Sequence, residues 1–307
     1  MSTLSPSSLT SRGFELEMSP ETFGILHDSH DIFHDGPACQ ARFREQGYLF
    51  FRDVLDREQI LEGRRVLCER LASSGYLHPD HPLIDGVCNT DKIAYFMPDL
   101  TKDNQPLLKV LYTGAMMDFY SRFLGGPVRH YDFTWLRAVS ESGQGINPHC
   151  DIVYMGRGTF NVFTSWTPFG TIPREMGGLM ILEKSHLHAP KLNHYLHRDV
   201  DTYCTNGRHA AEIESGKKWW EWSGALANNP VHLRNKLGGR WLTADYEMGD
   251  LLVFGMSTIH ASLDNHTNRM RLSTDSRYQL ASEPVDERWV GENPIGHNQA
   301  GKRGRIC

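Results

Sequence analysis

Three residues of this chain have the types and spacing needed to hold a metal ion. His149 and Asp151 are one residue apart, and His260 lies 109 positions after Asp151 (260 minus 151). We expect the first pair to open a β-strand, where side chains at i and i+2 share one face, so that both reach one ion while Cys150 points away. Two imidazoles and one carboxylate with open coordination positions are the donor set of non-haem Fe(II) oxygenases.

An arginine follows the third of these residues in what we expect to be the next strand. Arg271 lies eleven positions after His260. Its planar, permanently charged guanidinium suits a carboxylate, which it binds through paired charge-assisted hydrogen bonds. On a strand, the side chains of Arg269 and Arg277 would point to the same face as that of Arg271, so alternation alone does not choose among the three arginines.

The elements that must position these groups are predicted to be mainly strands. From Tyr131 onward, short apolar or alternating runs are separated by Gly, Pro and Asn, which is typical of a sandwich or jelly roll. Upstream, Asp56 and Gln59 resemble a capping pair that opens a helix, and a second helix is expected over 105–123. We therefore predict a mainly β fold with flanking α-helices, a double-stranded β-helix of the jelly-roll, cupin-like type.

Composition narrows the functional classes. Lys and Arg number 32 against 37 Asp and Glu, and this net charge of -5 argues against binding to nucleic acid or an anionic membrane. The sequence contains no run of eighteen apolar residues, so no membrane-spanning helix is predicted. The six cysteines lack a C-x-x-C pair or framework spacing, which indicates a reducing compartment. We expect a soluble, cytoplasmic protein.

Five segments, spread from about Phe43 to Tyr278, resemble the phytanoyl-CoA dioxygenase (PhyH) family of Fe(II)/2-oxoglutarate-dependent oxygenases. They are Gly-Tyr-Leu-Phe-Phe-Arg-Asp-Val-Leu-Asp from Gly47, His-x-Asp at His149, Ser-Trp-Thr-Pro-Phe around Trp166, Gly-Gly-Leu-Met-Ile-Leu-Glu-Lys-Ser-His ending at His186, and Gly-Asp-Leu-Leu-Val-Phe continuing through His-x-Ser-x-x-Asn to Arg271. The last is the most specific, because its spaced polar residues follow one apolar strand in the family's order.

The resemblance implies a role for each candidate residue. Iron would be bound by His149, Asp151 and His260, and 2-oxoglutarate by Arg271 and Ser262 at its distal carboxylate and by Trp166 as a wall. The spacing from His260 selects Arg271 over the other two arginines. Related halogenases carry Gly or Ala in place of the metal-binding carboxylate, so an aspartate at this position favours hydroxylation or another oxidation.

The predicted function is that of a dioxygenase that uses O2 and 2-oxoglutarate, with ascorbate in support. It would hydroxylate a small metabolite or acyl substrate and release succinate and CO2. One alternative is a non-catalytic cupin-like metal-binding or sensor protein. Another is a metal-dependent isomerase or hydrolase, which would have no need of Arg271. For the upstream basic residue with which some relatives touch the co-substrate, Lys92 and Arg137 are both candidates.

The single oxygenase domain is expected to occupy most of the chain. In order, the predicted parts are an N-terminal surface arm with little secondary structure (1–40), the domain itself (41–285) with a helical layer (41–130) and a barrel (131–285) containing an insertion (190–239), and a C-terminal tail (286–307). The insertion is long and unpatterned, as functional insertions and lids often are. Its residues Trp219, Trp220 and Trp222 either cover the substrate or anchor the insertion.

Several histidines are interpreted as structural rather than metal-binding. His186 and His188 are expected at a turn, and His194 and His197 in a solvated loop. A further group, His27, His30 and His34, lies in the polar N-terminal segment, where only adventitious metal binding is expected.

Overall fold

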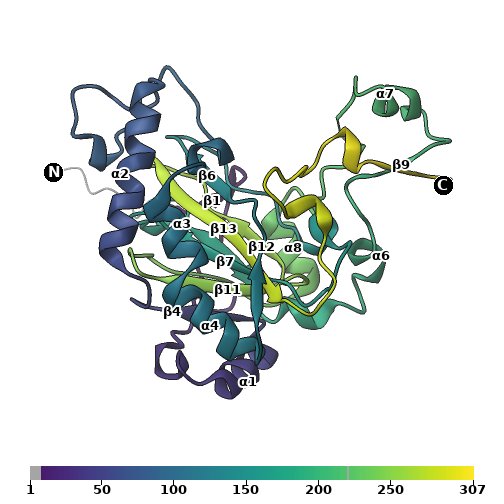
Figure 1. Cartoon of the computed structure of the whole chain (residues 1–307), viewed down its shortest axis with the longest axis horizontal. Helices are drawn as coiled ribbons and strands as arrows, with labels where there is room; N and C mark the ends of the chain where they lie inside the picture. Colours follow the sequence, from purple (N-terminus) through teal and green to yellow (C-terminus); the bar gives the residue numbers. More distant parts are fainter. Residues whose placement is uncertain (1–7, 220) are drawn as a thin grey trace.

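Two β-sheets form the centre of the molecule (Figure 1). The structure is a computed structural model and describes residues 8–219 and 221–307. The larger sheet has the order β4 (Tyr48–Phe51), β11 (Leu251–Gly255), β7 (Phe163–Pro168), β13 (Arg271–Leu280) and β5 (Val128–His130), with β6 (Trp135–Val139) also paired to β13. The smaller sheet has the order β12 (His260–Ser262), β8 (Leu179–Leu182), β10 (Trp241–Thr243) and β3 (Phe23–Ile25). The predicted mainly β class is confirmed.

Alternation along the strands separates an interior face from a face that carries helices. On β11, Leu252 and Phe254 join Trp166 in a core cluster between the sheets, whereas Leu251 and Val253 join the cluster under the helices. Because successive side chains of a strand point to opposite faces, the residues of β13 are likewise divided between the interior face and the helix-covered face. In its register with β7, Asp275 lies opposite Trp166, which places the odd-numbered residues of β13 on the interior face.

A helical layer covers the outer face of the larger sheet. It consists of α1 (Gly36–Gln46), α2 (Arg57–Ser73), α3 (Gln105–Tyr112) and α4 (Gly114–Leu124). The predicted cap of α2 is confirmed, since the Asp56 side chain accepts hydrogen bonds from the N–H groups of Glu58 and Gln59. The single helix predicted over 105–123 is wrong, because Thr113 is extended (φ -141°, ψ 177°) and divides it in two. None of the described helices is long and apolar enough to cross a membrane.

Short elements complete the described chain. They are β1 (Thr10–Ser11), β2 (Phe14–Glu15), α5 (Ile152–Met155), α6 (Asn193–Leu196), β9 (Thr202–Cys204), α7 (Ala210–Glu214), α8 (Pro230–Leu237), β14 (Arg303–Arg305) and the 3-10 helices η1 (His30–Ile32), η2 (Leu83–Asp85), η3 (Pro98–Thr101), η4 (Arg174–Met176), η5 (Ser185–His188), η6 (Glu287–Trp289) and η7 (Gln299–Gly301).

The N-terminal segment is packed against the barrel, which corrects the expectation of a surface arm. Strand β3 pairs in parallel with β10 and so extends the smaller sheet. Further upstream, the buried Asp264 carboxylate accepts hydrogen bonds from the Thr10 hydroxyl and from the N–H groups of Arg12 and Gly13. The polar composition of this segment gave no sign of these contacts, because their partners lie more than two hundred residues away in sequence.

The C-terminal tail is joined to the segment 190–239. In Figure 1 the tail and the part of this segment that carries β9 and α7 project together from the sheets, on the side away from α2. Strand β14 pairs in parallel with β9, and a disulfide connects Cys204 to Cys307. This disulfide does not agree with the reducing compartment inferred from cysteine spacing. The sequence did not predict it, because the two cysteines are 103 residues apart and no motif links them. The other four cysteines are buried free thiols.

An ion-pair cluster centred on Asp201 anchors the tail further. The buried Asp201 carboxylate contacts Arg288 Nη1 at 2.6 Å, His297 Nδ1 at 2.7 Å and Lys302 Nζ at 3.0 Å, all three from the tail. Burial alone would raise the pKa of Asp201, but the hydrogen bonds and charges of His297 and Lys302 lower it to about 2. The ionised carboxylate is therefore a structural link between β9 and the tail.

Asp201→Asn is expected to lower the free energy of unfolding by about 3 kcal/mol at pH 7, because it leaves buried cations without their partner. Urea denaturation followed by tryptophan fluorescence measures the change, with the exposed Asp80→Asn as the matched control. Since the folded pKa lies below the ordinary 3.8, the stabilisation is full above that pH and is lost as the pH falls through about 2. The difference from wild type should accordingly narrow at pH 3. Equal stability of wild type and variant at pH 7 would contradict this role.

Candidate metal centre

The three predicted metal ligands meet between the two sheets. Asp151 Oδ1 lies 3.7 Å from His149 Nε2 and 3.6 Å from His260 Nε2. Within residues 8–219 and 221–307 this is the one group of three or more His, Cys, Asp or Glu side chains whose donor atoms lie within 4.8 Å of one another. All three side chains are buried, so they form an enclosed cluster rather than a surface one.

The local structure that brings His149 and Asp151 together is a turn, which corrects the predicted strand. His149 makes a single antiparallel bridge to His260, each N–H donating to the other residue's carbonyl at 3.1 Å. Asp151 already has helical backbone angles (φ -64°, ψ -25°) and precedes the short helix α5. Cys150 points elsewhere, as expected, and its Sγ donates to the Ser257 carbonyl at 3.4 Å.

Backbone carbonyls fix the tautomers of both imidazoles. His149 Nδ1 lies 2.7 Å from the Asn147 carbonyl, and His260 Nδ1 lies 3.0 Å from the Thr258 carbonyl. A carbonyl only accepts, so each Nδ1 carries the proton and each Nε2 presents a lone pair to the site. Burial, together with the nearby His260, lowers the pKa of His149 to about 3, and burial also lowers the pKa of His260. Both rings are therefore neutral and able to bind a cation.

The Asp151 carboxylate is oriented through one of its oxygens. Oδ2 accepts hydrogen bonds from Thr164 Oγ1 at 2.5 Å and from Arg277 Nη2 at 3.0 Å, and this leaves Oδ1 directed at the two imidazoles. Burial alone would raise the pKa of Asp151, but the charge of Arg277 and the hydrogen bond from Thr164 hold it well below its usual range. Asp151 is thus an anionic donor.

The donor set and its spacing fit a divalent transition metal. Ligand atoms at about 2.1 Å from such an ion are separated by roughly 3.0–3.6 Å from one another at octahedral to wider angles. The two separations from Asp151 Oδ1 are close to the upper end of this range. With three protein donors, the remaining coordination positions would be open to small molecules.

The residues predicted to bind the co-substrate lie on facing walls of the same interior. Ser262 is two positions along β12 from His260, or about 6.6 Å at the usual rise of a strand. It lies opposite Leu179 of β8, and Arg271 reaches from β13 across to the carbonyl of Gly177, two residues before Leu179. Burial lowers the pKa of Arg271 to about 10, so its guanidinium stays charged, and its Nε has no hydrogen-bond partner among the described residues.

The remaining predicted residue and the alternative arginines are also placed. Trp166 is buried in the interior, with its ring centroid 4.5 Å from that of Tyr246. Arg269 is exposed and lies outside β13, whereas Arg277 is held by Asp151. Of the two upstream basic candidates, Lys92 donates to the Ser74 carbonyl at the surface, and Arg137 lies in the cavity described next.

A cavity of about 390 Å³ opens onto the metal centre. His149 and Asp151 form part of its wall, beside Arg137 and Arg277. Segments that the family motifs do not include also contribute, namely Ser223 from the predicted insertion and His297 from the tail. Sequence reasoning missed His297, since nothing in the sequence of the tail indicates that it returns to the site.

Of the insertion's tryptophans, neither Trp219 nor Trp222 is among the residues that line this cavity. The ring of Trp222 contacts Tyr195 edge-on at 5.6 Å between centroids and stacks under the Arg198 guanidinium at 3.5 Å, which favours an anchoring role. Trp219 is exposed, and Trp220 lies outside the described residues. Among the histidines interpreted as structural, His186 belongs to η5 and contacts the Arg44 carbonyl through Nε2 at 3.0 Å.

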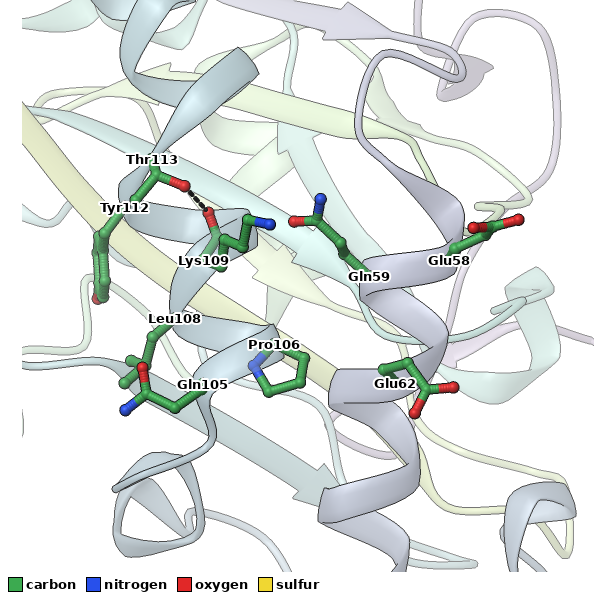
Figure 2. A pocket seen from close by; sticks show the side chains of 9 residues that line it. All are labelled: Glu58, Gln59, Glu62, Gln105, Pro106, Leu108, Lys109, Tyr112 and Thr113. Atoms are coloured by element: carbon green, nitrogen blue, oxygen red, sulfur yellow. Dashed lines mark hydrogen bonds between the residues drawn. The ribbon is translucent and has the colours of Figure 1, made fainter.

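A larger hollow of about 810 Å³ lies elsewhere, between α2 and α3. Figure 2 shows its walls, with Glu58, Gln59 and Glu62 on α2, Lys109 on α3 and Thr113 directly after α3. Its lining contains no histidine or cysteine, and Thr113 Oγ1 donates to the carbonyl of Lys109 in the last turn of α3. It therefore lacks the ligand chemistry found between the sheets.

Comparison with known proteins agrees with the geometry. The family model described as phytanoyl-CoA dioxygenase (PhyH) matches residues 43–273. Among curated relatives, the 1-deoxypentalenic acid 11-beta-hydroxylases of Streptomyces arenae and Streptomyces exfoliatus are 25% and 24% identical, each covering 85% of this chain and 87% of the relative.

Solved structures share the fold at low sequence identity. The epimerase SnoN from nogalamycin biosynthesis, in complex with Fe3+, alpha ketoglutarate and nogalamycin RO, is 17% identical with a TM-score of 0.55, over 85% of this chain and 93% of SnoN. EctD from S. alaskensis with 2-oxoglutarate and 5-hydroxyectoine is 13% identical with a TM-score of 0.55, over 100% and 98% of the two chains. The jelly-roll architecture is thereby confirmed.

Arg277→Gln should weaken metal binding by about 10- to 100-fold, because the residue orients the Asp151 carboxylate and holds it ionised. Anaerobic titration with Fe(II) measures the dissociation constant. The control is Arg269→Gln, which removes an exposed guanidinium just outside the same strand and should leave the constant unchanged. If both variants bind iron like wild type, Arg277 does not support the metal centre.

Proposed function

This chain belongs to the phytanoyl-CoA dioxygenase (PhyH) family of Fe(II)/2-oxoglutarate-dependent oxygenases, and on that premise we propose that it hydroxylates a small molecule at a centre formed by His149, Asp151 and His260. The observation that carries this proposal is the convergence of two neutral imidazoles and one ionised carboxylate in a buried cluster. It supports Fe(II) as the bound metal, since this donor set leaves positions open for reactants.

We assign the distal carboxylate of 2-oxoglutarate to Arg271 and Ser262. Support comes from the buried Arg271 guanidinium, whose Nε lacks a partner among the described residues, and from the position of Ser262 on the same wall as His260. Trp166 would form the apolar side of this compartment. A buried, unpaired donor is costly to a protein, and an anionic co-substrate would remove that cost.

When bound, iron and 2-oxoglutarate supply the oxidation, in which O2 is consumed, succinate and CO2 are released and the substrate gains a hydroxyl. The protein's own contribution is positional. Asp151 and the two histidines would fix the metal, and Arg271 would fix the far end of the co-substrate. The cavity walls would hold the substrate near the metal and exclude water, so that the oxidant meets substrate rather than solvent or protein.

The proposed substrate is a small molecule, in line with the natural products and metabolites named for the relatives. A cytoplasmic location and support of the iron by ascorbate remain predictions. The Cys204–Cys307 disulfide bears on the former, because a cytosolic disulfide is unusual outside redox regulation.

Succinate formation from 2-oxoglutarate, in the presence of Fe(II), ascorbate and O2, tests the proposal. Arg271→Gln is expected to raise the KM for 2-oxoglutarate by roughly 30- to 140-fold, because it removes charge-assisted hydrogen bonds worth about 2–3 kcal/mol. Arg269→Gln again serves as the control and should leave KM unchanged.

The alternatives give different results. A non-catalytic cupin-like protein would bind iron but form no succinate. A metal-dependent isomerase or hydrolase would keep its full activity in the Arg271→Gln variant. If wild-type protein yields no succinate, alone or with any substrate tried, and binds no 2-oxoglutarate, the proposed function is wrong.

A further inference from the structure

We propose that the substrate is an organic anion with an apolar body, and that its acidic group binds at Arg137. This rests on the function proposed above and specifies the substrate class of the same site. The cavity over the metal centre provides both parts of the required recognition surface, a guanidinium with free donors and a group of aromatic side chains.

The charges around the site do not balance without such a substrate. Around the metal centre, the larger sheet contributes three guanidiniums (Arg137, Arg271 and Arg277) against two carboxylates (Asp151 and Asp275). Histidines bind a metal as neutral rings and add no charge. A divalent cation and the dianionic 2-oxoglutarate cancel each other. One positive charge therefore remains in an enclosed, low-dielectric space, where an unpaired charge is unfavourable.

In the other charged cluster near the cavity, the arginines and the lysine are matched by carboxylates. It pairs three carboxylates with three cations at the base of the tail, namely Asp199, Asp201 and Asp286 with Arg157, Arg288 and Lys302. His297 contacts Asp201 within this cluster. The surplus positive charge therefore belongs to the metal-centre side of the cavity.

Arg137 is the guanidinium that is free to receive an anion. It lies on β6, opposite Ser273 of β13, and its side chain is 16% exposed to the cavity. Its one ionic contact is a loose approach of Nε to Asp275 Oδ2 at 3.4 Å, and no described residue makes a hydrogen bond to its Nη atoms. An arginine with a free pair of Nη donors matches the two oxygens of a carboxylate.

The other two guanidiniums are already committed. Arg277 uses Nη2 to hold Asp151, and its central carbon lies 4.1 Å from the ring centroid of Trp135, with its remaining nitrogens sealed from solvent. Arg271 bonds to the Gly177 carbonyl deep in the interior and is not part of the cavity lining. Neither presents an accessible donor edge to a molecule entering the cavity.

Aromatic side chains around Arg137 supply the apolar part of the surface. Tyr95 and Phe96 are 37% and 43% exposed, and Trp135 lies beside them in the cavity wall. The first two are held in place because Ala138 N–H donates to the Tyr95 carbonyl and Phe96 bridges to Arg137. Large exposed aromatics next to a charged group are typical of a site for an amphipathic ligand.

A single free guanidinium also favours a simple acid over an acyl-coenzyme A. Coenzyme A carries several phosphate charges and needs a broad basic surface, whereas this cavity offers one guanidinium with unused donors. The inferred ligand is thus a compact carboxylic acid with an apolar or aromatic body.

Equilibrium dialysis of the full-length protein, kept anaerobic with Fe(II) and 2-oxoglutarate, tests this proposal without turnover. The probes are matched pairs of small aromatic acids and their primary amides: phenylacetate, cinnamate and indole-3-acetate against the three amides. We expect acids to bind at least about 10-fold more tightly than their amides. Arg137→Gln should abolish the preference, Arg137→Lys should retain part of it, and the exposed control Arg269→Gln should retain all of it.

Retention of 2-oxoglutarate, measured in the same dialysis, separates this proposal from the proposed function. Arg137→Gln should keep 2-oxoglutarate bound while losing the acids. The proposal is overturned if amides bind as well as acids, if no acid binds, or if Arg137→Gln loses 2-oxoglutarate and leaves acid binding intact. Failure of wild type to retain 2-oxoglutarate would instead count against the function itself.

Discussion

The site depends on keeping one carboxylate ionised in the buried space between the two sheets. Asp151 is almost entirely buried, and an isolated carboxylate in such a place would normally be protonated. Thr164 and Arg277 prevent this by hydrogen bonding to a single oxygen, which also turns the other oxygen toward the histidines. The same contacts that stabilise the charge therefore set the direction in which the carboxylate would bind a metal.

Strand β13 organises the remaining groups through its period of two. Its odd-numbered residues face the interior, so Arg271, Ser273, Asp275 and Arg277 form a line that runs from the proposed co-substrate compartment to the proposed metal ligand Asp151. Even-numbered residues such as Leu272 and Tyr278 pack against the helical layer. A slip of one residue in the register of β13 would turn its charged side chains toward the helices and its apolar side chains into the site. The packing of Leu272 and Tyr278 against the helical layer therefore also fixes which residues face the interior.

The sequence was sufficient to predict the strands, the capped helix α2 and the residues of the candidate metal centre, because each has a local pattern or a family motif. It was insufficient wherever a contact joins distant segments. The turn at Asp151, the docking of Thr10 on Asp264, the Cys204–Cys307 disulfide and the return of His297 to the cavity have no local signature. Apolar periodicity also did not reveal the break at Thr113, where the backbone becomes extended.

The most direct test of the account is a crystal structure of the protein prepared anaerobically with Fe(II) and 2-oxoglutarate, with the iron located by anomalous scattering. We predict one iron bound by His149 Nε2, His260 Nε2 and Asp151 Oδ1, and the distal carboxylate of 2-oxoglutarate at Arg271 and Ser262. Iron bound elsewhere, or a 2-oxoglutarate carboxylate that makes no contact with Arg271, would contradict it.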